Sequence, residues 1–129
     1  YFLRSTYFFV SVVKNQQRMD EITTEQQDGR QFVQTTLGVL GGKWKILILW
    51  HVRNQPKRFS ELKRLIPEIS EKVLIQQLRD LEKDGIVYRH DYAEMPPKVD
   101  YSFTEYGKSL KPVLRMLCNW GEKHLKKNI

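Results

Sequence analysis

The sequence predicts one mainly α-helical domain with a small β-hairpin near its C-terminal end. Two observations predict this fold class. Apolar residues recur at helical spacing from Phe32 to about Asp84, and after Gly85 the pattern changes to runs of β-branched and aromatic residues. A length of 129 residues suits one domain and is too short for two independent cores. We expect residues 31–129 to form this domain and residues 1–30 to be an N-terminal extension.

Two short helices are predicted at the start of the domain. Apolar residues lie at helical spacing from Phe32 to Leu40, and this helix stops at Gly41-Gly42. The stretch from Trp44 to Val52 is apolar nearly all round, which predicts the central buried helix. It ends before the turn signal at residues 54–56.

Two further helices are predicted from their capping residues. Phe59 is expected in a short extended segment, and Ser60 is expected to be the N-cap of a third helix that ends at Pro67. Ser70 is expected to cap a fourth helix over residues 71–84, which a glycine then ends.

The hairpin and a last helix follow. Ile86–His90 and Val99–Phe103 are rich in β-branched and aromatic residues and predict two strands. Residues 91–98 include two prolines and predict the loop between them. Thr104 is expected to cap the last helix, with a kink at Pro112. A short helix, a turn, a capped helix and a hairpin are the order of a winged helix-turn-helix, with the hairpin as its wing.

The fourth predicted helix has two contrasting faces. Three leucines cluster on one side, and a polar stripe of Lys72, Gln76, Arg79 and Lys83 lies opposite. Arg and Gln match guanine and adenine edges, and Lys suits phosphates. Any solvated helix face can have this composition. The position of the stripe, after a short helix and before a hairpin, is what favours DNA recognition.

The distribution of charge supports the same role. The formal net charge is +7, and residues 1–28 hold three basic and four acidic residues, so the whole positive excess lies after residue 28. Such an excess favours polyanionic partners such as nucleic acid. The hairpin adds basic side chains suited to flanking phosphates or to the minor groove. The residues that we expect to contact DNA are Arg58, Ser60, Ser70, Lys72, Gln76, Gln77, Arg79, Lys83, Arg89 and Lys98.

No residue pattern indicates catalysis or a bound metal. The single cysteine, Cys118, excludes an internal disulfide and a cysteine-rich zinc site. The three histidines show no ligand spacing, and the sequence has no nucleophile–base pair or glycine-rich phosphate loop. We therefore expect no enzymatic activity, no metal and no cofactor. The cysteine usage also suggests a reducing compartment, so we expect a cytoplasmic, nucleoid-associated protein.

The N-terminal residues are unlike the rest of the chain. Residues 1–14 are aromatic and apolar, but the stretch is too short and too interrupted to span a bilayer, and we expect no membrane partner. Two interpretations of residues 1–18 stay open. They are an upstream or artificially added extension, or they are an extra helix or strand that packs on a dimer.

Several ordered motifs carry a resemblance to a known family. They are Gly41–Lys45, Arg58–Leu62, Ile69-Ser70, Gln76–Val87, Pro96–Tyr101 and Thr104–Gly107. From about residue 31 to 121 the chain resembles the HxlR family of bacterial winged-helix regulators, which are related to the MarR group. The resemblance implies a DNA-binding regulator that dimerises through its terminal helices. It also implies that residues 70–84 form the recognition helix and that residues 96–98 belong to the wing.

Two positions depart from the family pattern. Many members carry a cysteine just before the first helix, in places used as an aldehyde or oxidant sensor, and this chain has Gln31 followed by Phe32 there. The resemblance therefore implies no cysteine switch at this position. Ile75 stands where a small polar residue is common, so base preference is not carried over. An isoleucine there can contact a thymine methyl group or pack on the wing.

Together these features predict a sequence-specific transcriptional regulator of double-stranded DNA, either an activator or a repressor. We expect a homodimer that places two recognition helices in successive major grooves, about 34 Å apart, on a near-palindromic operator. An unknown small-molecule effector is a further possible partner. The alternative function is a winged-helix module that docks other proteins without specific DNA recognition. The residues expected at the dimer interface are Leu110, Val113, Leu114, Leu117 and Trp120, because these apolar residues exceed what one small core needs.

Overall fold

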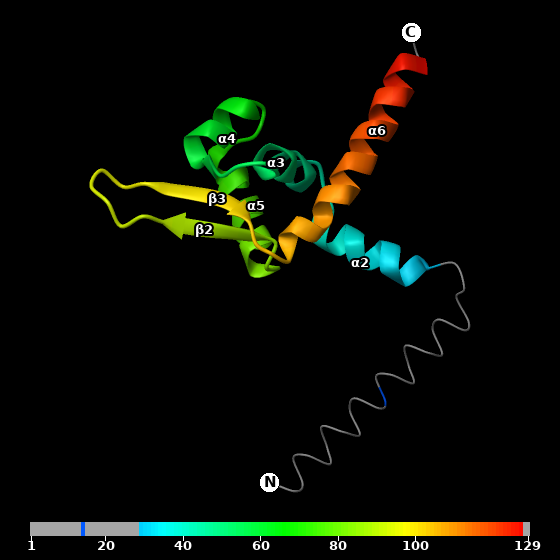
Figure 1. Ribbon diagram of the computed structural model, residues 1–129, viewed down its shortest axis with the longest axis horizontal. Coiled ribbons are helices and arrows are strands. Elements are labelled where there is room, and N and C mark those ends of the chain that lie inside the picture. Colours follow the sequence, from blue (N-terminus) through cyan, green and yellow to red (C-terminus); the bar gives the residue numbers. More distant parts are fainter. Residues whose placement is uncertain (1–13, 15–28, 128–129) are drawn as a thin grey trace, which may run out of the picture. The chain divides into compact units, whose positions relative to one another are not determined.

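The computed structural model describes Lys14 and residues 29–127. The chain forms two compact units, residues 1–38 and residues 39–129, and helix α2 (Arg30–Leu40) crosses the boundary between them. The elements that follow are α3 (Trp44–Val52), β1 (Lys57–Arg58), α4 (Phe59–Leu65), α5 (Glu71–Lys83), β2 (Val87–Asp91), β3 (Val99–Phe103), the 3₁₀ helix η1 (Gly107–Leu110) and α6 (Lys111–Lys127), as Figure 1 shows. The predicted fold class is confirmed. The two interpretations of residues 1–18 lie outside the described residues, apart from Lys14.

Helices α3 and α5 supply the centre of the hydrophobic core. Ile48 and Leu49 of α3 and Leu74, Leu78 and Leu81 of α5 are each 1% exposed or less. Helix α3 packs against α4, α5 and β3, which confirms it as the central helix that its apolar sequence predicts. The rest of the core comes from Leu40, from α4 and the residues between α4 and α5, from the hairpin and the residue before it, and from Leu114 of α6.

The three strands form one antiparallel sheet in the order β1-β3-β2. In the hairpin, Val87 is paired with Phe103 and Asp91 with Val99. The first strand of the hairpin begins and ends one residue later than the sequence predicts, whereas the second matches the prediction. The backbone N–H of Tyr92 donates to the Lys98 carbonyl oxygen at 3.0 Å and closes the tip.

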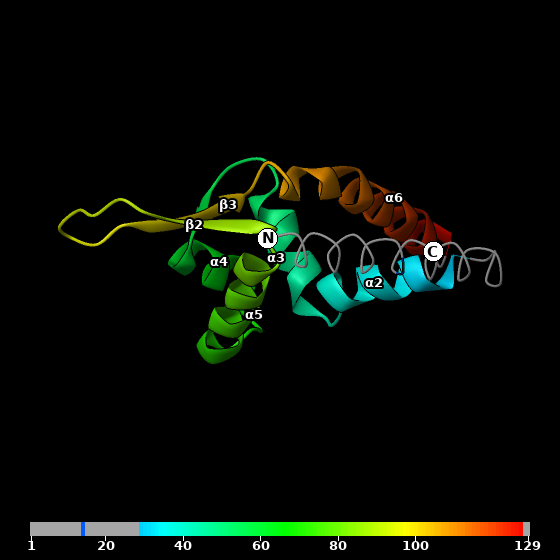
Figure 2. The same ribbon diagram turned by 90° about the horizontal axis from the view of Figure 1, so that it is seen from below.

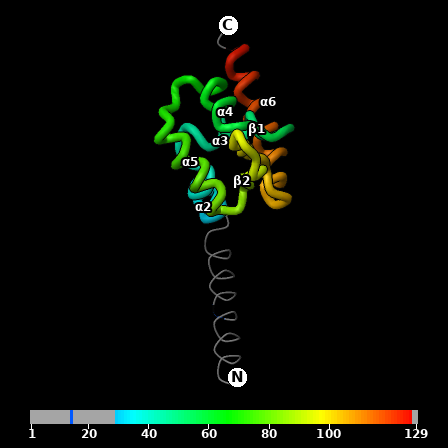
Figure 3. The backbone as a smooth tube through the Cα atoms, turned by 90° about the vertical axis from the view of Figure 1, so that its left-hand side faces the viewer, coloured from blue at the N-terminus to red at the C-terminus, as the bar shows by residue number. Residues whose placement is uncertain are grey.

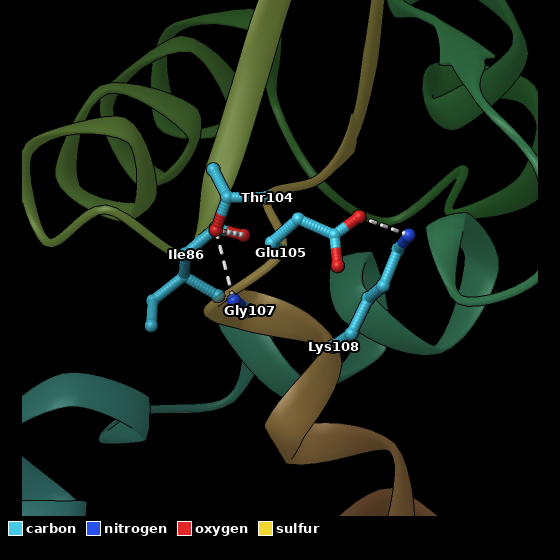
Figure 4. Close-up of polar contacts among 5 residues, drawn as sticks. All are labelled: Ile86, Thr104, Glu105, Gly107 and Lys108. Carbon is cyan, nitrogen blue, oxygen red and sulfur yellow. Dashed lines mark hydrogen bonds and ion pairs between the residues drawn. The ribbon is translucent and has the colours of Figure 1, made fainter.

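A hydrogen-bonded turn fixes the base of the hairpin (Figure 4). The Thr104 hydroxyl donates to the Gly85 carbonyl oxygen at 2.6 Å. The Gly107 N–H donates to that hydroxyl at 2.8 Å, as Figure 4 shows. Thr104 therefore fixes the turn before η1, whose N-cap is Tyr106, and it is not the cap of the last helix that the sequence predicts. A Cβ atom at Gly107 would collide with the backbone carbonyl of Ile86, so this position requires glycine. Through these hydrogen bonds, the turn links Gly85, after α5, to Gly107, at the beginning of η1.

Two predicted features are wrong in detail. Helix α4 already begins at Phe59, after an N-cap at Arg58, so Phe59 is helical and Ser60 lies inside the first turn. The Arg58 N–H donates to the Glu61 side chain at 3.2 Å, which favours this earlier start. Pro112 lies in the first turn of α6, where proline is tolerated, so it is not placed to kink this helix.

The hairpin separates two long helices of the second unit. Figures 2 and 3 show α5 and α6 extending on different sides of the hairpin. Each helix can therefore present a surface to a different partner. Within the described residues, no helix has the length and apolar character needed to cross a membrane.

Candidate nucleic-acid interface

Helix α5 has the two faces that its sequence predicts. Its N-cap is Ser70, whose side-chain oxygen accepts a hydrogen bond from the Val73 N–H at 3.2 Å. Its three leucines are buried, and the predicted polar stripe lies in solvent. The exposed residues of the stripe are Lys72, Gln76, Arg79 and Lys83. A shallow groove along this face is lined by side chains from residues 71–79.

Two neighbours of the stripe differ in how far they reach solvent. Gln77 is half-buried, so it lies at the flank of the stripe. Ile75 is 40% exposed and lines the same groove as Lys72 and Arg79. Ile75 is not among the residues predicted to contact DNA. Its spacing, three residues after Lys72 and four before Arg79, places it on the same helix face and could have predicted its position.

One member of the stripe belongs to a side-chain network. The Gln76 Nε2 donates to Asp80 Oδ1 at 2.9 Å, and the Lys45 Nζ lies 3.6 Å from Asp80 Oδ2. The Lys45 side chain is 13% exposed and comes from α3. The spacing of Gln76 and Asp80 is a recognisable helical pair, but no sequence signal connects Asp80 with Lys45.

The wing carries its basic residues on an internally bonded hairpin. The Arg89 guanidinium lies 4.0 Å from Asp91 Oδ2, and the Lys98 Nζ lies 4.1 Å from the centre of the Tyr92 ring. The Tyr92 hydroxyl donates to Asp100 Oδ2 at 2.6 Å. That hydrogen bond raises the pKa of Tyr92 above its ordinary value, and burial and the charge of Asp100 act in the same direction.

The last two predicted contacts lie at the beginning of α4. Arg58 and Ser60 are both exposed. Arg58 ends the two-residue strand β1, where it is paired with Asp100 of β3. Both residues are thus placed by the sheet that also carries the wing.

Helix α6 presents an apolar surface. Of the residues expected at a dimer interface, Val113, Leu117 and Trp120 are 38%, 45% and 66% exposed. Leu110 is half-buried. Leu114 is 1% exposed and packs in the core of the single chain, so its assignment to an interface is corrected. Two further apolar residues of this helix, Met116 and Leu125, are exposed and are not among the predicted interface residues.

The apolar surface continues beside α6. The Trp120 and His124 rings stack with their centres 4.9 Å apart. A hollow of about 360 Å³ between α3 and α6 is lined by Ile46, Leu47, Trp50, Leu114, Leu117 and Cys118.

Comparison with known proteins identifies the family. Residues 39–129 match the profile of the HxlR-like helix-turn-helix family. YtcD of Bacillus subtilis, an uncharacterized HTH-type transcriptional regulator, is 55% identical over 93 residues, which are 72% of this chain and 74% of YtcD. YkvN of the same organism, described in the same words, is 58% identical over 88 residues, which are 68% of this chain and 75% of YkvN.

Solved structures agree with this assignment. The crystal structure of ytcD has a TM-score of 0.70 at 53% identity and matches 73% of this chain and 96% of its own. The redox regulator HypR in its oxidized form has a TM-score of 0.69 at 47% identity and matches 70% and 94%. A MarR-family regulator from Enterococcus faecalis has a TM-score of 0.68 at 37% identity and matches 78% and 92%. The chain therefore belongs to the HxlR-like helix-turn-helix family and has the winged-helix fold of bacterial transcriptional regulators.

Proposed function

We propose that this protein is a sequence-specific regulator of transcription that binds double-stranded DNA as a homodimer. Helix α5 enters the major groove, and the hairpin contacts the flanking backbone or minor groove. The observation that carries the proposal is α5 itself. It has a fully buried leucine face and an exposed face of Lys, Gln and Arg, and it is followed directly by a hairpin that carries Arg89 and Lys98.

The residues on the outer face of α5 have different roles in binding DNA. Arg79 is exposed and has the forked donors that suit guanine O6 and N7. Lys72 and Lys83 suit phosphates, and contacts of this kind position the protein without selecting a sequence. Ser70 stands at the helix N-terminus, where backbone N–H groups favour an anion.

The wing supports contacts that depend little on sequence. The Lys98 ammonium lies over the Tyr92 ring and Arg89 lies 4.0 Å from Asp91, so the hairpin carries both cationic side chains. At the tip, Met95 is 91% exposed. Cationic side chains at the rim of a hairpin suit a groove edge.

The apolar face of α6 supports the homodimer. Trp120 and Leu117 are large apolar residues that the single chain leaves exposed, and contiguous exposed apolar surface marks interaction sites. A second copy would cover the same face by twofold symmetry. Two copies would then present two α5 helices to a near-palindromic operator. A cytoplasmic, nucleoid-associated location and an effector that alters binding are part of the same proposal.

The proposal is tested by selecting bound fragments from random DNA with the purified protein. Arg79→Ala should lower discrimination at one base pair by roughly 1–3 kcal/mol. Lys98→Ala should weaken binding to all sequences and reduce the salt slope by about one. Lys123→Ala removes an exposed charge from α6 and is the matched control. If Arg79→Ala and Lys98→Ala bind like the unmodified protein, the assigned face is wrong. Weak binding without sequence preference or salt dependence would instead favour the protein-docking module.

A further inference from the structure

We propose that Asp80 is a positioning residue that fixes the amide of Gln76, so that Gln76 selects a base with an exocyclic amino group. The inference rests on the proposed function, because it assumes that α5 lies in the major groove. It adds the residue that decides what Gln76 can recognise. Asp80 itself lies beside the exposed stripe and is not among the predicted contacts.

The chemistry of the Gln76–Asp80 contact permits only one orientation of the amide. A carboxylate paired with an ammonium group offers acceptor oxygens alone. The Gln76 side chain can satisfy such a partner only through Nε2, which lies 2.9 Å from Asp80 Oδ1. In the flipped amide, Oε1 would face Oδ1, and two acceptors would repel each other. The orientation therefore follows from the donor and acceptor inventory of the two groups.

Lys45 holds the carboxylate in place from the neighbouring helix. Its Nζ lies 3.6 Å from Asp80 Oδ2, and its side chain is 13% exposed. One carboxylate oxygen therefore contacts the lysine of α3 and the other contacts the glutamine of α5. The network links the orientation of Gln76 to the packing between α3 and α5, which is part of the core.

The fixed amide has a defined preference in the major groove. With Nε2 engaged by Asp80, Gln76 keeps Oε1 as its acceptor. Adenine N6 and cytosine N4 are donors in the major groove, whereas guanine O6 and thymine O4 are acceptors. The second hydrogen on Nε2 can still donate to adenine N7, so adenine fits best. Asp80 thus makes Gln76 discriminate amino bases from keto bases at one position of each half-site.

Replacing the carboxylate by an amide isolates this effect. In Asp80→Asn the shape is nearly unchanged, but the new side chain can both donate and accept. The Gln76 amide can then adopt either orientation. We expect the amino preference at that one position to fall about tenfold, as a lost good base contact does. Overall affinity should rise slightly, because one negative charge near the DNA is removed.

The experiment is in vitro selection from random DNA, with the preference scored position by position for a set of variants. Gln76→Ala should lose the preference at the same position as Asp80→Asn. Asp80→Glu keeps an acceptor-only carboxylate and should retain it. Asp84→Asn removes the same charge at the C-cap of α5, without a contact to Gln76, and should leave every base preference unchanged. If Asp80→Asn melts too early to be assayed, Asp80→Ala replaces it with the same expectation.

Each outcome bears on a different claim. If Gln76→Ala loses the preference and Asp80→Asn keeps it, the positioning role of Asp80 is overturned and the proposed function stands. If the unmodified protein selects no sequence, the proposed function itself fails. A general loss of affinity in Asp80→Asn, equal at all positions, would assign Asp80 a structural role only.

Discussion

Helices α5 and α6 are both amphipathic, but the single chain uses their apolar residues in opposite ways. In α5, which has 13 residues, Leu74, Leu78 and Leu81 are all buried. In α6, which has 17 residues, Leu114 alone is fully buried, while Trp120 and other apolar side chains remain exposed. Helix α5 is therefore stabilised by packing its leucines into the core of the single chain. Its outer face makes no contribution to that core and can bind a polyanion. Helix α6 presents a surface that the single chain does not cover.

The difference shows why the two helices should have different partners. Exposed Lys, Gln and Arg side chains on α5 already make favourable contacts with water and need no protein partner. Exposed Trp and Leu side chains on α6 gain free energy when they are removed from water, at about 25 cal/mol per Å² of apolar surface. A second copy of the chain is the partner that α6 favours, and DNA is the partner that α5 favours.

The largest expected effect comes from the turn between β3 and η1, which is hydrogen-bonded to Gly85 after α5. Gly107→Ala would place a Cβ atom against the backbone carbonyl of Ile86. The turn must then shift, which disturbs the packing of the segment after α5 against the beginning of η1. We expect the free energy of unfolding to fall by about 3 kcal/mol, the upper end for overpacking. Chemical denaturation measures this directly.

The matched control is a second glycine, in α6. A Cβ atom at Gly121 would meet nothing within 4 Å, so Gly121→Ala should stabilise the helix by about 0.5–1 kcal/mol. Equal destabilisation by the two substitutions would show that the collision at Gly107 is not the cause.

The next effect concerns the apolar face of α6. Trp120→Ala should weaken the dimer by at least about 2 kcal/mol, or roughly 30-fold in its dissociation constant, because a buried tryptophan is a typical interface anchor. Sedimentation measured over a range of protein concentrations gives this constant. The free energy of unfolding of the monomer should change little, since Trp120 is 66% exposed. An unchanged dimer would remove α6 from the interface.

Local sequence signals predicted most of the fold but not which way α6 faces. The cap at Ser70 and the leucine face of α5 depend on neighbours within four residues, so they could be predicted. The apolar stripe of α6 is broad enough to face either the core or a partner, and spacing alone does not separate Leu114 from Leu117. The contact of Lys45 with Asp80 joins two helices and depends on their packing.

A smaller effect compares the two serines that were predicted as helix caps. Ser70 accepts the Val73 N–H, so Ser70→Ala should lower the free energy of unfolding by about 1 kcal/mol. Ser60 lies inside the first turn of α4, so Ser60→Ala should leave stability nearly unchanged. Thermal or chemical unfolding of both variants measures the difference. A larger loss for Ser60→Ala would restore Ser60 as the cap of α4.

The smallest effect concerns a hydrogen bond within the wing. Like the leucines of α5, and unlike Trp120 of α6, the Tyr92 hydroxyl has its partner within the single chain. The Tyr92 hydroxyl donates to Asp100, and this raises the pKa of Tyr92 above its ordinary value of 10.0. A pKa that is raised in the folded state stabilises the fold at pH values below the unfolded pKa. This stability is lost as the pH rises through the folded pKa. The unmodified protein should therefore have a higher melting temperature than Tyr92→Phe up to about pH 10, and this difference should shrink above that pH.

Tyr106→Phe, which removes an exposed hydroxyl, is the control. An advantage over Tyr92→Phe that stays constant through the alkaline range would show that the hydrogen bond to Asp100 is not its source.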